Sequence, residues 1–469
     1  MKKILLGVLS LSIVFILTSC ENTMEPLKSN GDITALNKSS AATIGINIVL
    51  NTGVTDKILK ELGKNGKVVD VFYEINAVRI LGKANVIPAV QELPFVNSAN
   101  PDAERNAPPF DIIADTTFID GISPWNLDAI NVTKEPFSSE RVVDNDGTGV
   151  YIGVLDTGLL HNWRQYLPDE RIASEYAKSF GGGGAMGTNV SEQPNKWERD
   201  VDSHGTHVTS IILGYNLNGT PINGVAPNAK VIPVKVLNQT GSGWSSVIAR
   251  GILYMAELKD GSLADYPVVV NMSLGGPGLD PLEKAAIDYA ISKGVIIVAS
   301  AGNNGEAGMG YPGAYEPVIS VAALGWVGEW TVPGWWYALD VPDPNIADNF
   351  YITDFSSRQL EGQDLDVAAP GSWVVGPYQV NMGQNSYYYL GGTSQASPHV
   401  AGIVALMAQK DPTLTAAQAE SILEGSALYL APGSRDVHNP DGSISTFSWG
   451  ADATGAGIAD AQAALAATP

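Results

Sequence analysis

The chain has almost no cysteine and little charge for its 469 residues. Its single cysteine, Cys20, excludes a disulfide within the chain and excludes a thiolate cluster that could hold a metal. Charged residues make up only 16%, and 27 Lys and Arg against 49 Asp and Glu give a formal net charge of −22. Nucleic acids and anionic lipid surfaces attract cationic proteins, so this balance argues against electrostatic binding to either.

Long hydrophobic runs are also scarce. The run at residues 4–17 follows Lys2 and Lys3 and has the length of a signal peptide, too short for a comfortable membrane span. The segment Leu-Thr-Ser-Cys that ends at Cys20 resembles a bacterial lipobox, in which the signal is cut before the cysteine and the thiol carries a lipid. We therefore expect a lipoprotein signal peptide at residues 1–19. An ordinary signal peptide with an incidental cysteine is the alternative.

A polar segment at residues 20–41 is typical of a flexible tether. The pattern that follows predicts a small α/β module at residues 42–99. Its strands are expected at 44–50, 68–75 and 78–81, and its helices at 55–63 and 84–93. Residues 100–122 are acidic and rich in proline, which is the character of a linker.

Continuous apolar runs alternate with helical patterns in the remaining residues, 123–469. Such runs are typical of strands that are buried on both faces of a parallel sheet. We predict strands at 150–155, 231–237, 268–272 and 295–300 and helices at 245–258, 281–293 and 394–410. The predicted fold class is therefore a doubly wound α/β domain with a mostly parallel sheet between helices, whose ligands bind beyond the carboxyl ends of the strands.

Three short motifs bring catalytic residue types into the order Asp, His, Ser. They are Asp-Thr-Gly at 156–158, His-Gly-Thr-His at 204–207 and Gly-Thr-Ser-Gln-Ala-Ser-Pro at 392–398. A serine hydroxyl needs an imidazole to take its proton, and a buried carboxylate orients that imidazole. Taken alone, an aspartate at a strand end is more often a turn cap. The three motifs together predict an Asp156, His204 and Ser394 triad.

The motifs resemble those of the subtilisin-like (subtilase) serine proteases, over roughly residues 125–467. The resemblance rests on five ordered segments: SHGTHV at 203–208, NMSLGG at 271–276, AGNNG at 301–305, GTSQASPHVAG at 392–402 and GAGIADA at 455–461. It implies that Asp156, His204 and Ser394 are catalytic and that the Asn303 side chain donates to the oxyanion. It also implies a structural role for His207, and His399 is better interpreted as structural too.

The same resemblance implies where substrate binds. Two segments would pair with it as an added strand and a third would line the primary pocket: Gly241, Ser242 and Gly243; Ser273, Leu274 and Gly275; and Ser300, Ala301 and Gly302. None of these segments contains an acidic residue. We therefore expect an apolar side chain before the cleaved bond.

The module at residues 42–99 resembles a subtilase propeptide, which helps its own enzyme to fold and inhibits it. An unrelated small domain is the alternative. Autoprocessing is expected within residues 100–122 or slightly upstream, at a bond that the sequence does not fix. No cofactor is expected for catalysis. Calcium commonly stabilises the family, and residues 216–223 offer the oxygen ligands that a structural calcium needs.

Two features depart from the family pattern. Gln395 stands where a methionine usually follows the serine, and residues 325–350 form an insertion that is dense in aromatic side chains. The insertion is as well explained by packing against its own domain as by a lid or an extended substrate rim.

The sequence therefore predicts an exported, lipid-tethered serine endopeptidase made as an autoprocessed zymogen. Its expected partners are protein or peptide substrates, its own propeptide, and a membrane reached through the lipid on Cys20; nucleic acid is not among them. It would be anchored at the cell envelope, with release of the catalytic domain left open. Two alternatives stay open: an inactive surface binding protein on the same scaffold, and a peptide transferase that uses the same triad.

Overall fold

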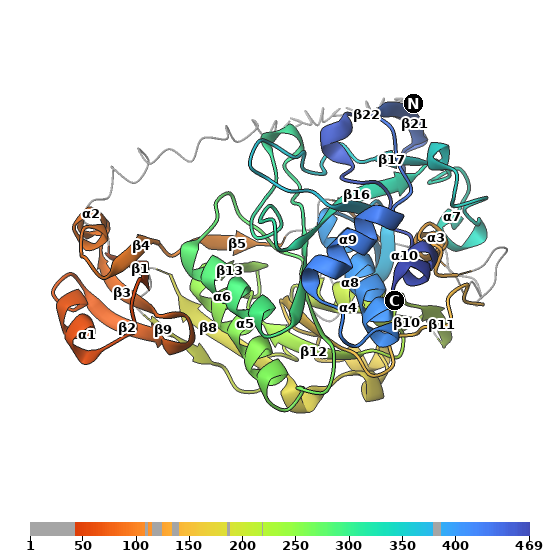
Figure 1. The fold of residues 1–469 in the computed structure, drawn as a ribbon. Coiled ribbons are helices and arrows are strands. Elements are labelled where there is room, and N and C mark those ends of the chain that lie inside the picture. Colours follow the sequence, from red (N-terminus) through yellow and green to blue (C-terminus); the bar gives the residue numbers. More distant parts are fainter. Residues whose placement is uncertain are drawn as a thin grey trace, which may run out of the picture.

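The computed structural model describes residues 43–107, 111–114, 124–133, 140–184, 188–217, 219–378 and 386–469. A small N-terminal module lies beside a much larger α/β unit (Figure 1). The predicted signal peptide, Cys20 and the tether lie outside the described residues. Within the described ranges, no helix combines the length and the apolar character needed to cross a bilayer.

The N-terminal module is a four-stranded antiparallel sheet covered by two helices. The sheet has the order β2-β3-β1-β4, and its helices pack on it through one apolar core. Helix α1 begins after Thr55, whose side chain accepts a hydrogen bond from Ile58 N, and ends at Gly63. The elements of the module are β1 (Thr43–Leu50), α1 (Asp56–Leu62), β2 (Lys67–Phe72), β3 (Ala77–Lys83), α2 (Ile87–Gln91) and β4 (Val96–Pro101).

A largely parallel sheet forms the centre of the large unit. Its order is β17-β16-β15-β14-β7-β12-β8-β9, with β18 also paired to β16. Only β17 and β9 run antiparallel to their neighbours. The strands are β7 (Tyr151–Asp156), β8 (Lys178–Gly183), β9 (Thr188–Glu192), β12 (Lys230–Lys235), β14 (Val268–Met272), β15 (Val295–Ser300), β16 (Ile319–Trp326), β17 (Phe350–Ile352) and β18 (Val367–Pro370). The predicted doubly wound α/β class is confirmed.

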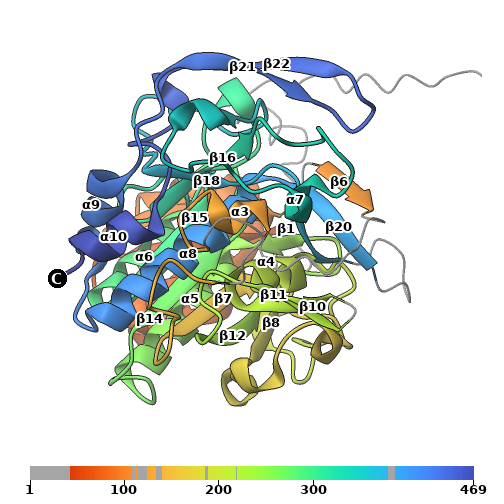
Figure 2. The same ribbon diagram turned by 90° about the vertical axis from the view of Figure 1, so that its right-hand side faces the viewer.

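Helices cover both faces of this sheet, so its strands are buried on both sides. Helices α4 (His204–Leu213) and α8 (Thr393–Lys410) share an apolar core with one face, and α5 (Ser245–Asp260) and α6 (Pro281–Ser292) with the other. In Figure 1, α5 and α6 lie on one side of the large unit and α4 and α8 on the other; Figure 2 shows the same ribbon turned by 90°. Smaller elements surround this centre: β5 (Glu104–Asn106), β6 (Asp111–Ala114), α3 (Trp125–Asp128), β10 (Gly214–Leu217), β11 (Thr220–Asn223), β13 (Ser242–Trp244), α7 (Trp335–Ala338), β19 (Val374–Tyr378), β20 (Ser386–Gly391), α9 (Ala416–Ser426), β21 (Gly433–His438), β22 (Ile444–Trp449) and α10 (Ala461–Ala467).

The N-terminal module docks beside α5 and α6 (Figure 1). Asp102, just after β4, accepts hydrogen bonds from Ser246 N at 3.0 Å and from the Ser245 and Ser246 hydroxyls at the start of α5. On the module side, Arg79 Nε donates to the same carboxylate at 3.1 Å. The described part of the predicted linker therefore has regular structure. It contains the end of β4, the contacts of Asp102 with α5, and strands β5 and β6.

The aromatic insertion packs into the large unit. Trp335 and Trp336 are fully buried, and the Trp335 ring lies 5.9 Å from Trp125 and 5.8 Å from Tyr389, measured between centroids. These contacts agree with the prediction that the insertion packs against its own domain, and Trp335 and Trp336 are not available to form a lid.

Candidate active site

Asp156 and His204 form a fully buried pair at the carboxyl end of the central sheet. Asp156 is the last residue of β7, and His204 is the first residue of α4. The imidazole Nδ1 lies 2.9 Å from Asp156 Oδ1 and 3.0 Å from Oδ2, and it donates its hydrogen to this carboxylate. Burial lowers the pKa of His204, but Asp156, with smaller effects from Asp202 and Asp200, leaves this pKa above its usual value.

A set of short-range contacts fixes the position of His204. Thr157 Oγ1 accepts a hydrogen bond from Gly205 N at 2.9 Å and donates one to the buried Asp200 at 2.8 Å. Only glycine fits at position 205, because a Cβ there would lie 2.3 Å from the Gly158 carbonyl oxygen. These contacts place the start of α4 directly against the end of β7.

Ser394 is the second residue of α8, in the helix turn whose backbone N–H groups have no intrahelical partner. Helix α8 packs against α4, which carries His204. The Ser394 hydroxyl donates to the Ser273 carbonyl at 3.3 Å, and His204 Nε2 is buried without a hydrogen-bond partner among the described residues. The structure thus holds no direct Ser394–His204 hydrogen bond. Such bonds often tighten only when substrate is bound.

Asn303 lies just beyond the end of β15, and its side chain is held by the residue before Ser394. Its Oδ1 accepts hydrogen bonds from Thr393 N at 2.9 Å and from Thr393 Oγ1 at 2.8 Å. Because the amide oxygen is engaged in this way, the amide group is oriented and its Nδ2 donors point away from Thr393. An oriented amide donor beside a nucleophile is the arrangement that stabilises a developing oxyanion.

The two other histidines near the site have structural surroundings. His207 donates from Nε2 to the Val374 carbonyl at 3.1 Å, and burial lowers its pKa to about 3. His399 lies between the Gln395 carbonyl and the Asn126 amide, each at 2.8 Å, and burial lowers its pKa to about 4. Both rings are therefore neutral at pH 7.

The chain's own strand β5 lies between the two segments predicted to bind substrate. It pairs antiparallel with β13 on one side, and Asn106 pairs with Gly275 on the other through two 3.0 Å hydrogen bonds. Ala107 N then donates to the Gly241 carbonyl at 3.0 Å. Segments that bind a strand between them are used for peptide recognition by β-strand addition.

The segment predicted to line the primary pocket follows β15. Ser300 and Ala301 are buried, while Gly302 is partly exposed and donates its N–H to Thr393 Oγ1 at 3.1 Å. Gln395, next to the serine, is fully buried, and within the described ranges neither polar atom of its amide has a hydrogen-bond partner.

Three carboxylates form a group that could hold a cation, away from the segment predicted for calcium. Asp364, Asp366 and Glu420 lie with oxygens within 4.8 Å of one another, and no described residue offers a hydrogen-bond partner to the buried Asp366 Oδ1. Burial raises the pKa of Asp366 to about 7; burial and then the neighbouring Asp366 raise that of Glu420 to about 8. An all-oxygen donor set fits calcium. The predicted segment at residues 216–223 carries strands β10 and β11, and Asn216 Oδ1 there accepts from Gly219 N.

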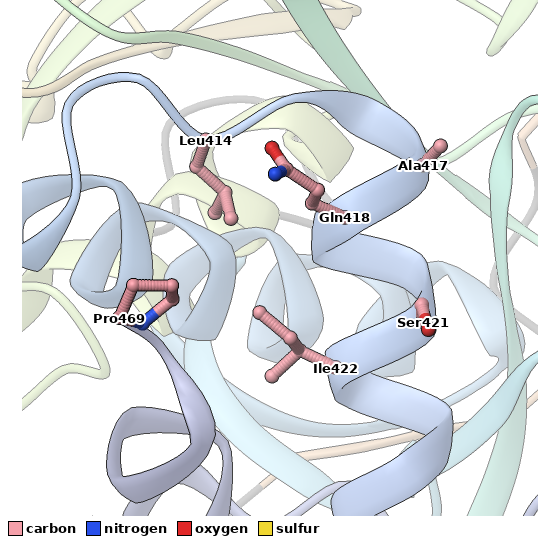
Figure 3. Close-up of a pocket in the computed structure, with 6 residues that line it drawn as sticks. All are labelled: Leu414, Ala417, Gln418, Ser421, Ile422 and Pro469. Carbon is pink, nitrogen blue, oxygen red and sulfur yellow. The ribbon is translucent and has the colours of Figure 1, made fainter.

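A pocket lies elsewhere, between α9 and Pro469 (Figure 3). Its lining consists of Leu414, Ala417, Gln418, Ser421, Ile422 and Pro469. Ser421 is the only hydroxyl among these lining residues, and none of the others can act as its base. We therefore do not assign the catalytic site to this pocket.

Comparison with known proteins gives a consistent result. The model of the subtilase family, Peptidase S8, matches residues 147–451. Subtilisin DY of Bacillus licheniformis is 34% identical over 288 residues, which are 61% of this chain and 85% of that protein. Subtilisin E of Bacillus subtilis is also 34% identical over 288 residues, and the match spans 62% of its length.

Solved structures show the same architecture. Fervidolysin from Fervidobacterium pennivorans, described as a keratinolytic enzyme related to subtilisin, has a TM-score of 0.62 at 24% identity and covers 91% of this chain and 61% of its own. Sphericase has a TM-score of 0.53 at 28% identity and covers 72% of this chain and 97% of its own. The protein belongs to the subtilase family. It is a serine-type endopeptidase, and enzymes of this family act on protein or peptide substrates without a cofactor for catalysis.

One pair of residues near the site was missed by the sequence analysis. Arg105 on β5 and Glu283 on α6 form an ion pair with an N–O distance of 2.6 Å, and both side chains are fully buried. Charged neighbours surround both residues in the sequence, Glu104 beside Arg105 and Lys284 beside Glu283, and the two positions lie 178 residues apart, so no local pattern pointed to the pair.

Proposed function

We propose that this subtilase hydrolyses peptide bonds through Asp156, His204 and Ser394. His204 Nε2 takes the proton of the Ser394 hydroxyl as its oxygen attacks the scissile carbonyl. Asp156 holds the ring so that Nδ1–H points to the carboxylate, and it stabilises the imidazolium that forms. The Asn303 amide and the Ser394 N–H donate to the oxyanion. His204 then protonates the leaving amine. In the second half of the reaction, His204 takes a proton from water as the water attacks the acyl-enzyme, and it returns that proton to Ser394 as the acid product leaves.

A single observation carries this proposal. The buried Asp156 carboxylate fixes Nδ1 of His204 and leaves Nε2 without a partner, on a helix that packs against the helix of Ser394. A buried imidazole nitrogen with no partner is costly unless another group uses it. The passing proton of a serine hydroxyl is such a use.

We further propose that the N-terminal module is an inhibitory propeptide and that the chain cuts itself within residues 100–122. Just before residues 108–110, strand β5 lies between the two substrate-binding segments. Just after them, Asp111 pairs with Gly391, which is three residues before Ser394. The described residues on either side of 108–110 thus flank the nucleophile, which favours a cut between Ala107 and Asp111. Domain boundaries at 1–19, 20–41, 42–99, 100–122 and 123–469 are part of this proposal.

Export, attachment of a lipid at Cys20 and a structural calcium ion complete the proposal. The first two rest on the sequence of residues 1–20. Asp364, Asp366 and Glu420 would hold the calcium ion, which would offset their mutual repulsion. Because the lipid would lie on the propeptide side of the cut, processing would release the catalytic domain from the membrane.

The test is intact-mass analysis of protein that begins at Glu21, with the wild type beside Ser394→Ala. We expect the wild type to split within residues 100–122 and the variant to stay whole. If the variant also splits at the same bond, Ser394 is not the nucleophile. If both proteins stay whole and Ser394 does not react with a fluorophosphonate, the results favour an inactive surface binding protein over a peptidase.

A further inference from the structure

Arg105 is the buried charged residue of β5, the strand that lies in the substrate cleft, whereas the neighbouring Glu104 is exposed. Its guanidinium makes four hydrogen bonds: Nε and Nη2 donate to Glu283 Oε2 at 3.0 and 2.6 Å, Nη2 to the Gly278 carbonyl at 2.9 Å, and Nη1 to the Glu104 carbonyl at 3.1 Å. The side chain is completely buried. Three of these four bonds go to acceptors of the peptidase domain, which remain in place when β5 leaves.

The pocket that holds this guanidinium is formed by the peptidase domain. A Cβ at Gly276 would lie 2.7 Å from Arg105 Nη1, so the glycine leaves the space that the guanidinium fills. Glu283 is fully buried in the first turn of α6, and its second oxygen, Oε1, has no hydrogen-bond partner in the part of the chain that the structure describes. A buried carboxylate that loses its cationic partner is strongly destabilised, so the empty pocket favours another cation.

The strand register gives the position of this pocket relative to the cleaved bond. Asn106 pairs with Gly275 in antiparallel fashion, so successive residues of a bound strand run from Gly275 toward Ser273. The Ser273 carbonyl accepts the hydrogen bond of the nucleophilic Ser394. A substrate in the same register has its residue before the cleaved bond opposite Ser273, its third residue opposite Gly275, and its fourth in the place of Arg105.

We propose that Glu283 makes the fourth substrate position before the cleaved bond selective for arginine. This inference rests on the proposed function, since it names a substrate class for the same cleft. The planar guanidinium can donate to Glu283 and to Gly278 together, whereas a lysine ammonium offers a point charge without this fork. The primary pocket that receives the residue before the cleaved bond is a separate site, for which an apolar side chain is expected.

The test uses activated wild-type enzyme and fluorescence-quenched peptides X-Asn-Ala-Phe-Ser-Gly, where X is arginine, lysine, citrulline or norleucine. Citrulline keeps the shape of arginine and removes its charge. We expect kcat/KM for the arginine peptide to exceed that for citrulline by at least about thirtyfold, with lysine in between. Product masses must place the cut after phenylalanine. Equal rates for arginine and norleucine, or cleavage at another bond, would overturn the inference.

Variants of the enzyme test whether Glu283 causes the preference for arginine at the fourth position. We expect Glu283→Gln to reduce the arginine-to-citrulline ratio to within about threefold, and Glu283→Leu to favour norleucine. The matched control is Asp288→Asn, which removes one charge from the exposed side of the same helix and should keep the wild-type ratio. An unchanged ratio in Glu283→Gln contradicts the inference. Hydrolysis of casein by the wild type is measured in parallel. If the wild type does not hydrolyse casein, the proposed function itself is contradicted.

Discussion

His204 is surrounded by carboxylates, with Asp156 on Nδ1 and Asp202 and Asp200 further away. Their negative charge favours the imidazolium that forms as Ser394 attacks. The cost of this arrangement is that the resting base picks up a proton at a higher pH than an ordinary histidine does. The same contacts that stabilise the transition state therefore set the acid limit of the enzyme.

We expect Asp156→Asn to lower kcat by about 10⁴, because the asparagine no longer holds the imidazole in the productive tautomer. In the wild type, kcat/KM should fall as the pH drops through the raised pKa of His204, because only the neutral ring accepts the serine proton. The variant lacks the largest raising influence, so its residual activity should persist to lower pH. A pH profile of both proteins checks this, and an acid limb that does not move would show that Asp156 leaves the pKa of His204 unchanged.

Gln395 makes the residue beside the nucleophile resistant to oxidation, because an amide, unlike a thioether, does not form a sulfoxide. We expect the wild type to keep most of its activity in dilute peroxide. The matched variant Gln395→Met should lose activity in step with the appearance of one added oxygen at residue 395, followed by peptide mass spectrometry. Equal loss of activity in both proteins would place the sensitive group elsewhere.

Strands β7, β12, β14 and β15 were predicted from sequence because each is a short apolar run, and such a run is almost sufficient to define a buried strand. Residues at their ends, such as Asp156, could be predicted for the same reason. The pair of Arg105 and Glu283 could not, since neither residue lies in a recognised motif and only the docking of β5 brings them together. Packing of the insertion against its own domain was one of the predicted alternatives, but its partners Trp125 and Tyr389 could not be predicted, because an aromatic-rich loop has no periodic pattern.

Strand β4 and helix α5 meet at Asp102, whose carboxylate accepts hydrogen bonds from both the module and the peptidase domain. We expect Asp102→Ala to weaken inhibition by the N-terminal module at least about tenfold, because the buried Arg79 guanidinium loses one of its two carboxylate partners. The measurement is the inhibition constant of residues 43–107 added in trans to the activated enzyme. Glu61→Ala, on the exposed face of α1, is the control and should inhibit like the wild-type module.

On the scale of the whole molecule, the large acid excess makes close carboxylates a recurring source of instability. Asp364, Asp366 and Glu420 come from the segment before β18 and from α9, so their repulsion acts between elements that must stay packed. The raised pKa values of Asp366 and Glu420 record this repulsion together with burial. A bound cation would relieve it.

The stability of the folded chain should accordingly fall as the pH rises from about 5 to 8. In the unfolded chain these carboxyls lose their protons near pH 4, whereas in the fold Asp366 and Glu420 keep theirs until about 7 and 8, so the native state binds more protons between these values. We expect Glu420→Gln to reduce this fall and to raise Tm at pH 8, and calcium to raise the Tm of the unmodified cluster. Thermal unfolding is measured in the Ser394→Ala background to prevent autolysis, with the exposed Glu361→Gln as control. If Glu420→Gln lowers Tm at pH 8 both with and without calcium, the cluster is held by attractive contacts and not by a cation.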